Sequence, residues 1–188
     1  MARRKARVDA AIAAADQDRG LLLVLTGAGK GKSSSAFGMV ARALGHGLAV
    51  HVVQFIKGRD NTGEATFFSR QPGVVWQVCG EGFTWETQDR ARDIVAAEAG
   101  WAHAARALAD PSVGLVVLDE LTYLINYGYL KLDRVLADLA ARPPMQHVVV
   151  TGRAAPRALV EAADTVSDVG DIKHAFRAGV RAQAGIDR

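Results

Sequence analysis

LLLVLTGAGKGKS, residues 21–33, is the stretch of sequence that decides the fold. Its apolar first half is typical of a buried strand, and a helical pattern follows it through about Leu44. Glycines allow consecutive backbone N–H groups to face one anion, and the N-terminus of the helix adds its positive end. A lysine adds a charge here, and a hydroxyl can bind Mg²⁺. The stretch predicts a phosphate-binding loop made of Gly27, Ala28, Gly29, Lys30, Gly31, Lys32 and Ser33.

The glycine spacing of this loop differs from the usual P-loop pattern. That pattern begins with a glycine at the position that Thr26 occupies here, and the first glycine of this chain, Gly27, comes one place later. We interpret the loop as a variant P-loop. The alternative is an ordinary glycine-rich turn between a strand and a helix.

Further apolar runs, separated by helical patterns, follow along the chain. The strand candidates are residues 48–56, 74–78, 115–118, 148–150 and 165–169, and helical spacing covers 89–109 and 132–141. Strands that are apolar on both faces and alternate with helices favour a mostly parallel sheet with helices on each side. The predicted fold class is a three-layer α/β domain of the P-loop NTPase-like kind. In the helix over residues 89–109 we expect one face to hold Ile94, Glu98, Trp101, Ala105 and Leu108, with Trp101 in the core.

The start of the chain differs from the rest in charge and pattern. Arg3, Arg4, Lys5 and Arg7 are basic, whereas the whole chain has 23 Lys and Arg against 20 Asp and Glu. Val8, Ala11, Ile12 and Ala15 have helical spacing, which predicts an amphipathic helix with a weak apolar stripe. We expect an N-terminal basic amphipathic arm over residues 1–19 and a single α/β domain over 20–188.

Composition excludes several classes of protein. The 188 residues suit one domain. Apart from its basic start the chain is nearly neutral in charge, which is a poor match to a dedicated nucleic-acid binder. The single Cys excludes a disulfide framework, and the five His show no metal-ligand spacing. No apolar run approaches the ~20 residues of a spanning helix, and the start does not fit a signal peptide. We expect a cytoplasmic protein that binds neither membrane nor nucleic acid.

Two acids follow the apolar run at residues 115–118. Asp119 or Glu120 at this strand end can hold Mg²⁺ directly or through water, as in the second nucleotide-site element of P-loop proteins. The alternative is a helix cap. The residues alone do not decide which of the two acids is the metal ligand.

Two large aromatic residues, Phe83 and Trp85, lie two positions apart in the loop-like stretch GFTWETQ, residues 82–88. One interpretation is a hydrophobic staple with a Thr84 or Thr87 cap before the next helix. The other is a surface for a flat apolar ligand.

Taken together, several segments resemble the corrinoid adenosyltransferases, which transfer the 5′-deoxyadenosyl group of ATP to Co(I) corrinoids. The resemblance covers residues 26–187 in order, with the segments TGAGKGKSS, AFG, ARALGHG, VVQFIKG, GFTWET, ADP, VVLDELTY, ARP, TGR, ADTVSD and KHAF. Ala28 stands where Asn is frequent in the family, and Ser33 stands where Thr is frequent. The loss of the Asn side chain removes one contact to the nucleotide and leaves the backbone contacts intact.

The resemblance implies roles for particular residues and a set of partners. Residues 27–33 would hold the triphosphate of ATP, bound in reverse of the usual P-loop direction, with Lys32 as its catalytic charge. Ser33 and Glu120 would hold Mg²⁺, and Phe83 and Trp85 would face the corrinoid and act in catalysis. The implied protein is a homodimer that receives electrons from a reductase, expected to be a flavoprotein. It would release tripolyphosphate in adenosylcobalamin biosynthesis or salvage.

Two other functions are compatible with parts of the sequence. A P-loop ATPase or kinase would use Glu120 to orient water or an acceptor hydroxyl, and would release ADP or orthophosphate. A noncatalytic nucleotide-responsive module would instead bind RNA or DNA through residues 3–7, with strong salt dependence.

Overall fold

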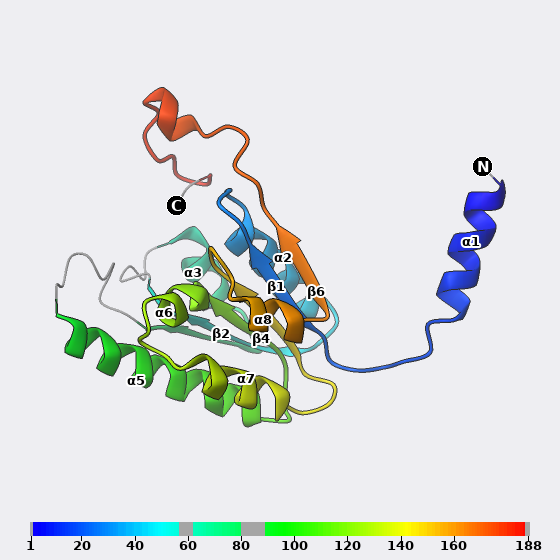
Figure 1. Ribbon diagram of the computed structural model, residues 1–188, viewed down its shortest axis with the longest axis horizontal. Helices are drawn as coiled ribbons and strands as arrows, with labels where there is room; N and C mark the ends of the chain where they lie inside the picture. The colour runs from blue at the N-terminus through cyan, green and yellow to red at the C-terminus, as the bar shows by residue number, and fades with distance from the viewer. Residues whose placement is uncertain (1, 57–61, 80–88, 187–188) are drawn as a thin grey trace.

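The structure is a computed structural model that describes residues 2–56, 62–79 and 89–186. Six parallel strands form one sheet in the order β3-β2-β4-β5-β1-β6 (Figure 1). They are β1 Leu22–Thr26, β2 Ala49–Gln54, β3 Val74–Val78, β4 Val113–Asp119, β5 His147–Thr151 and β6 Thr165–Asp168. Because the sheet is wholly parallel, all its carboxyl ends meet at one edge.

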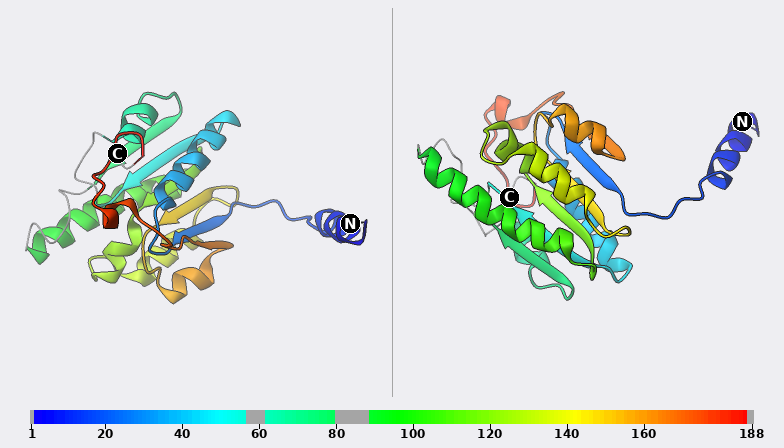
Figure 2. Two further views of the ribbon diagram at one scale, coloured as in Figure 1. Left: turned by 90° about the horizontal axis from the view of Figure 1, so that it is seen from above. Right: turned by 60° about the horizontal axis from the view of Figure 1, so that its bottom comes forward.

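Helices cover both faces of the sheet, which confirms the predicted three-layer α/β fold (Figures 1 and 2). α2 (Lys32–Gly45) and α3 (Gly63–Phe68) lie on one face. The other face holds α5 (Arg90–Ala109), α6 (Leu121–Asn126), α7 (Leu132–Ala140) and α8 (Arg157–Ala162). A short 3₁₀ helix, η1 (Ala175–Ala178), follows β6. No helix in the described part of the chain is long and apolar enough to cross a membrane.

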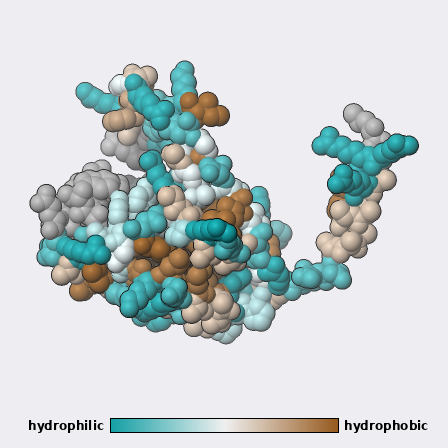
Figure 3. All heavy atoms as spheres, viewed as in Figure 1, coloured by the Kyte–Doolittle hydropathy of each residue, from teal (hydrophilic) through white to brown (hydrophobic). Residues whose placement is uncertain are grey.

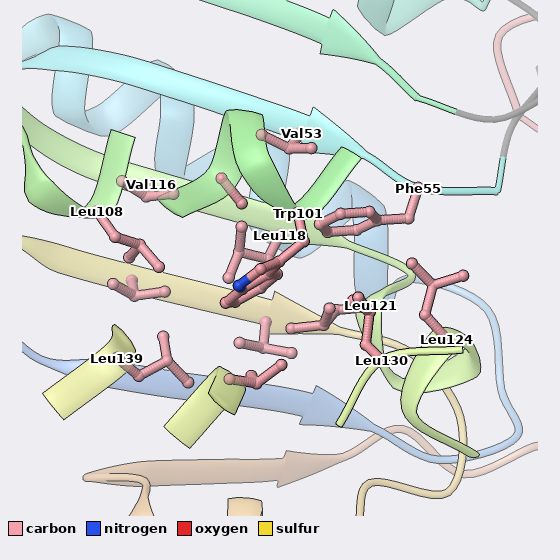
Figure 4. Packing of buried hydrophobic residues seen from close by; sticks show 14 of the residues in the cluster. Val53, Phe55, Trp101, Leu108, Val116, Leu118, Leu121, Leu124, Leu130 and Leu139 are labelled. Atoms are coloured by element: carbon pink, nitrogen blue, oxygen red, sulfur yellow. The ribbon is translucent and has the colours of Figure 1, made fainter. Parts of the chain in front are cut away.

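Strand residues alternate between two apolar cores, one on each face. Along β4, Val116 and Leu118 contact the α5 side, whereas Leu115 and Val117 contact the α2 side. Trp101 is fully buried on the α5 side, where Figure 4 shows it among Phe55 and other apolar side chains, so its predicted core position is confirmed.

The face of α5 that is buried differs by about one residue position from the face predicted to be buried. Glu98 is only half-buried and pairs with Arg134, whereas Ala97 and Ala104 are buried. The prediction followed the large side chains, but a helix packed closely against a sheet places small ones at the contact. Gly100 shows this, because a Cβ there would lie 3.0 Å from Cys79 Cβ.

The N-terminal segment is helical, as predicted, and stands apart from the sheet. α1 (Ala2–Ala13) is joined to β1 by an extended connection, and residues 3–19 are all exposed (Figures 1 and 2). Figure 3 shows hydrophilic atoms on this helix beside weakly apolar ones. Val8 is 50% exposed and Ile12 68%, so these members of the predicted apolar stripe are exposed in the single chain.

Candidate functional site

Polar residues end five of the six parallel strands. These last residues are Thr26, Gln54, Asp119, Thr151 and Asp168, each at the end of β1, β2, β4, β5 and β6 respectively. β1, β2, β4 and β5 are otherwise mainly apolar. Ligands of open parallel α/β sheets bind outside the carboxyl ends of the strands, so this edge is the candidate site.

The glycine loop, residues 27–31, joins β1 to α2 and packs against the last residue of β6 and the residues after it. Gly27 has φ 98°, and a Cβ there would lie 2.3 Å from Asp168 Oδ1. Gly29 donates its N–H to the Val169 carbonyl at 2.7 Å. No other residue type fits at Gly27, both because of its backbone conformation and because of this close approach.

Thr26 explains the late first glycine. It is still the last residue of β1, and its hydroxyl accepts a hydrogen bond from the Ala155 N–H at 3.1 Å. In the usual P-loop the chain leaves the strand at this position, with a glycine. Here the position still belongs to the strand, and its hydroxyl is hydrogen-bonded.

Lys32, the first residue of α2, points back into the loop. Its Nζ donates to the carbonyls of Gly27 and Gly29 at 2.8 and 2.7 Å, and the residue is buried. Burial lowers the pKa of Lys32, the carboxylates of Glu120, Asp119 and Asp168 oppose that shift, and Arg153 adds to it. The ammonium thus lies inside the loop, where it can exchange carbonyl contacts for those of an anion.

Asp119 is fully buried at the centre of a polar network. Its Oδ1 accepts from the Ser33 and Thr151 hydroxyls, each at 2.7 Å, and its Oδ2 accepts from Gln54 Nε2 at 2.9 Å. The predicted loop hydroxyl and the predicted strand-end acid are therefore in direct contact.

Glu120, the residue after β4, has a left-handed backbone with φ 61° and ψ 25°. Its N–H donates to the Thr151 hydroxyl at 2.9 Å, which holds this conformation. Such a backbone in a residue with a Cβ costs on the order of 1 kcal/mol, and strained residues of this kind cluster at functional sites. Its negative charge raises the pKa of Lys32, against the effect of burial.

The segment after β5, residues 152–155, forms the next wall of the site. The Thr122 hydroxyl donates to the Arg153 carbonyl at 2.7 Å, and Asn126 Nδ2 donates to the Ala154 carbonyl at 3.0 Å. A Cβ at Gly152, where φ is 142°, would lie 2.0 Å from Thr122 Oγ1. These contacts fix the backbone around the exposed Arg153, whose positive charge lowers the pKa of Lys32.

The structure brings together some of the predicted residues and adds others. Residues 27–33, Asp119 and Glu120 converge at the sheet edge, whereas Phe83 and Trp85 lie outside the described residues, as do Thr84 and Thr87. Sequence reasoning missed Gln54, Thr151 and Asp168. The signal that could have marked them is a polar residue at or next to the carboxyl end of a predicted strand.

These features define the chain as a nucleotide-binding protein of the P-loop class: a glycine loop between β1 and α2, an inward lysine, and an acid bonded to the loop hydroxyl. The sequence matches the family described as ATP:corrinoid adenosyltransferase BtuR/CobO/CobP over residues 18–187. The chain belongs to this family, so the expected family and enzyme class are confirmed.

Curated relatives are similar in sequence over nearly the whole length of this chain. A corrinoid adenosyltransferase of Pseudomonas aeruginosa is 65% identical over 188 residues, which cover 100% of this chain and 93% of that protein. Corrinoid adenosyltransferase CobA of Salmonella typhimurium is 53% identical over 183 residues, 97% of this chain and 93% of that protein.

Among solved structures, the flagellar accessory protein FlaH from Methanocaldococcus jannaschii has a TM-score of 0.50 at 12% identity, covering 82% of this chain and 73% of that one. At this identity the likeness concerns the fold alone.

Proposed function

We propose that this chain transfers the 5′-deoxyadenosyl group of ATP to the Co(I) centre of a corrinoid and releases tripolyphosphate. The reaction follows from family membership, and one structural observation supports the position of the active site. The glycine loop, Lys32 and the Ser33–Asp119 pair lie together at the carboxyl edge of the sheet. We place the triphosphate against residues 27–33.

The reaction demands positioning and electrostatic stabilisation. Co(I) supplies the electron pair of the new Co–C bond, and the C5′–O bond of ATP breaks with its electron pair going to triphosphate. Negative charge therefore grows on the leaving oxygen, where a preorganised cation is most effective. Lys32 has this role in our proposal, and Arg153 on the facing segment supports it. No general base is needed, because no proton moves in this step.

A magnesium ion fits the donor set at the loop. Ser33 and Glu120 offer the oxygen atoms that Mg²⁺ prefers, and Mg²⁺ sites with phosphates need only one or two carboxylates from the protein. Within the described residues no cluster of three or more His, Cys, Asp or Glu could hold a metal by itself, so a shared protein–phosphate site fits better. When bound, Mg²⁺ would neutralise charge on the triphosphate. Ser33 and Glu120 are the ligands we assign to it, and Asp119 orients Ser33.

The corrinoid side of the site rests on the family resemblance. We assign Phe83 and Trp85 to the lower face of cobalt, where two bulky uncharged rings would exclude an axial ligand and ease reduction of Co(II). A cytoplasmic homodimer that takes electrons from a flavoprotein reductase completes the proposal.

Product analysis tests this function against the P-loop hydrolase or kinase alternative. Chemically reduced cobalamin, ATP and Mg²⁺ should give the visible spectrum of a Co–C bond and tripolyphosphate in equal amounts. ADP or orthophosphate as the main product, with no Co–C bond, would favour the alternative. Salt-sensitive RNA or DNA binding that depends on residues 3–7 would instead favour a nucleic-acid module.

A further inference from the structure

We propose that Gln54 and Trp76 form a positioning relay for the phosphate and metal site. Trp76 fixes the orientation of the Gln54 amide, Gln54 holds Asp119, and Asp119 orients the Ser33 hydroxyl toward a bound divalent cation. The inference rests on the proposed function, which places that cation at Ser33, and it adds two residues from β2 and β3 to the site.

The first half of the relay has a single orientation. The Trp76 Nε1–H lies 3.1 Å from Gln54 Oε1, and Gln54 Nε2 lies 2.9 Å from Asp119 Oδ2. An indole nitrogen only donates, so the amide oxygen must face Trp76 and the amide N–H must face Asp119. Reversing the amide would place its oxygen against a carboxylate oxygen and its N–H₂ against an indole N–H. Trp76 therefore makes Gln54 a donor to Asp119.

The second half sets the direction of two hydroxyl protons. Thr151 Oγ1 accepts the Glu120 N–H at 2.9 Å, so its own proton is available for Asp119 Oδ1 at 2.7 Å. Ser33 Oγ donates to the same oxygen at 2.7 Å. A hydroxyl that gives its one proton to a carboxylate keeps its lone pairs for a cation. With Oδ2 held by Gln54, the carboxylate cannot rotate away from Ser33.

Packing holds the relay in place. Gln54 and Asp119 are both fully buried. The Trp76 ring stacks on Phe68, with centroids 5.9 Å apart, and lies 5.1 Å from the Phe37 ring. The Trp76 ring on β3 is thereby held against Phe68 of α3 and Phe37 of α2, with its N–H directed at Gln54. Losing residues that orient a metal ligand commonly weakens metal binding by about 10–100-fold.

The test is the affinity of Mn²⁺ for the protein–ATP complex, measured by electron paramagnetic resonance of free Mn²⁺ without corrinoid, so that no turnover occurs. Gln54→Leu should weaken Mn²⁺ binding by about 10-fold or more. Trp76→Phe keeps the stacked ring and removes only the N–H, and should weaken binding in the same direction. The double variant should be no weaker than Gln54→Leu alone, because Trp76 acts through Gln54.

Two matched controls separate this role from a general loss of stability. Gln146 is a second buried glutamine, at the other end of the sheet, which donates to three backbone carbonyls. Trp101 is a second tryptophan whose N–H bonds a carboxylate, that of Asp138, at 2.8 Å. Gln146→Leu and Trp101→Phe should lower the melting temperature and leave Mn²⁺ affinity unchanged.

Ser33→Ala distinguishes failure of the relay from failure of the proposed site. If Ser33→Ala weakens Mn²⁺ binding while folded Gln54→Leu binds like wild type, the relay is overturned and the site stands. Additive effects of Gln54→Leu and Trp76→Phe would also overturn it. If Ser33→Ala itself leaves binding unchanged, the metal assignment of the proposed function fails.

Discussion

At the scale of single residues, the charge of Lys32 is the first property to test. Its ammonium lies inside the loop, against the Gly27 and Gly29 carbonyls. Lys32→Ala should lower adenosyl transfer at saturating ATP by roughly 10²–10³, the scale for loss of one preorganised contact to a developing charge. Turnover is measured with chemically reduced cobalamin, and Lys131→Ala on the exposed N-cap of α7 serves as the control. A folded Lys32→Ala variant with wild-type turnover would contradict the phosphate assignment.

Glu120 combines backbone strain with a proposed metal role, and the two can be separated. Glu120→Gln removes the charge and keeps the strained left-handed backbone. Glu120→Gly removes the charge and also relieves the backbone strain. Both should raise the Mg²⁺ concentration needed for half-maximal activity, but Glu120→Gly should gain about 1 kcal/mol of unfolding free energy over Glu120→Gln. Magnesium titrations and urea unfolding measure the two effects. Unchanged titrations in both variants would move the metal role to Asp119 or to water alone.

Sequence predicted the residues of this site unevenly. The loop could be predicted because its glycines, lysine and hydroxyl lie close together in the sequence, and each residue type has a known part in binding phosphate or Mg²⁺. The contact between Gln54 and Asp119 could not be predicted, because the two residues are 65 positions apart and a polar strand end does not show which other strand end lies beside it. The position of Thr151, 32 positions from Asp119, likewise depends on which strands are neighbours.

At the scale of elements, the strands and long helices were predictable because their apolar patterns span several residues. α3, α6 and α8 were not predicted, since six residues hold fewer than two helical turns and show almost no periodicity. α6 begins directly after the strained Glu120, so tertiary contacts decide its start more than local sequence does.

The entry into β1 depends on Asp164, which connects two segments distant in sequence. Its carboxylate accepts from Arg19 Nη2 at 2.6 Å and from the Leu22 N–H at 2.8 Å. The Arg19 hydrogen bond, then that of Leu22, lowers the pKa of Asp164. A lowered pKa contributes stability above the unfolded value of about 3.9, and this is lost as pH falls through the folded value.

Asp164→Asn should therefore destabilise the protein most at neutral pH. Its difference from wild type in unfolding free energy should shrink as the pH falls below about 4. Urea unfolding at pH 7 and at acidic pH measures this, with Glu161→Gln of the exposed Arg157–Glu161 pair as a control expected to change little. A difference that grows with acidification would contradict the assigned sign.

The segment with Phe83 and Trp85 follows β3 in the sequence. If these rings exclude an axial ligand from cobalt, either alanine variant should slow turnover when a mild protein reductant supplies the electron. Pre-reduced Co(I) should bypass much of the defect, because the impaired step precedes it. Electron paramagnetic resonance of Co(II)-corrinoid with ATP should show a four-coordinate signal in wild type and a weaker one in each variant. A full signal in both would return these rings to a packing role.

At the scale of the whole molecule, residues 2–19 of the N-terminal arm stand apart from the sheet (Figure 1). Residues 3–19 are exposed throughout, while Gly20 is buried and donates its N–H to the Pro144 carbonyl. Because the apolar stripe is exposed in the single chain, we propose that it contacts a bound corrinoid or a second copy.

Deleting residues 1–18 keeps Arg19 and its bond to Asp164, and so leaves the entry into β1 intact. The melting temperature of the ligand-free protein should then stay near that of wild type, because residues 3–18 are exposed in the single chain. Corrinoid KM should rise more than ATP KM, since the stripe of Val8, Ala11, Ile12 and Ala15 no longer covers the corrinoid or the neighbouring subunit. Steady-state kinetics with each substrate varied in turn, together with thermal unfolding, measure both effects. Equal losses for both substrates with a lower melting temperature would make the arm a structural element of the fold, and the exposed stripe would then have a partner within the chain.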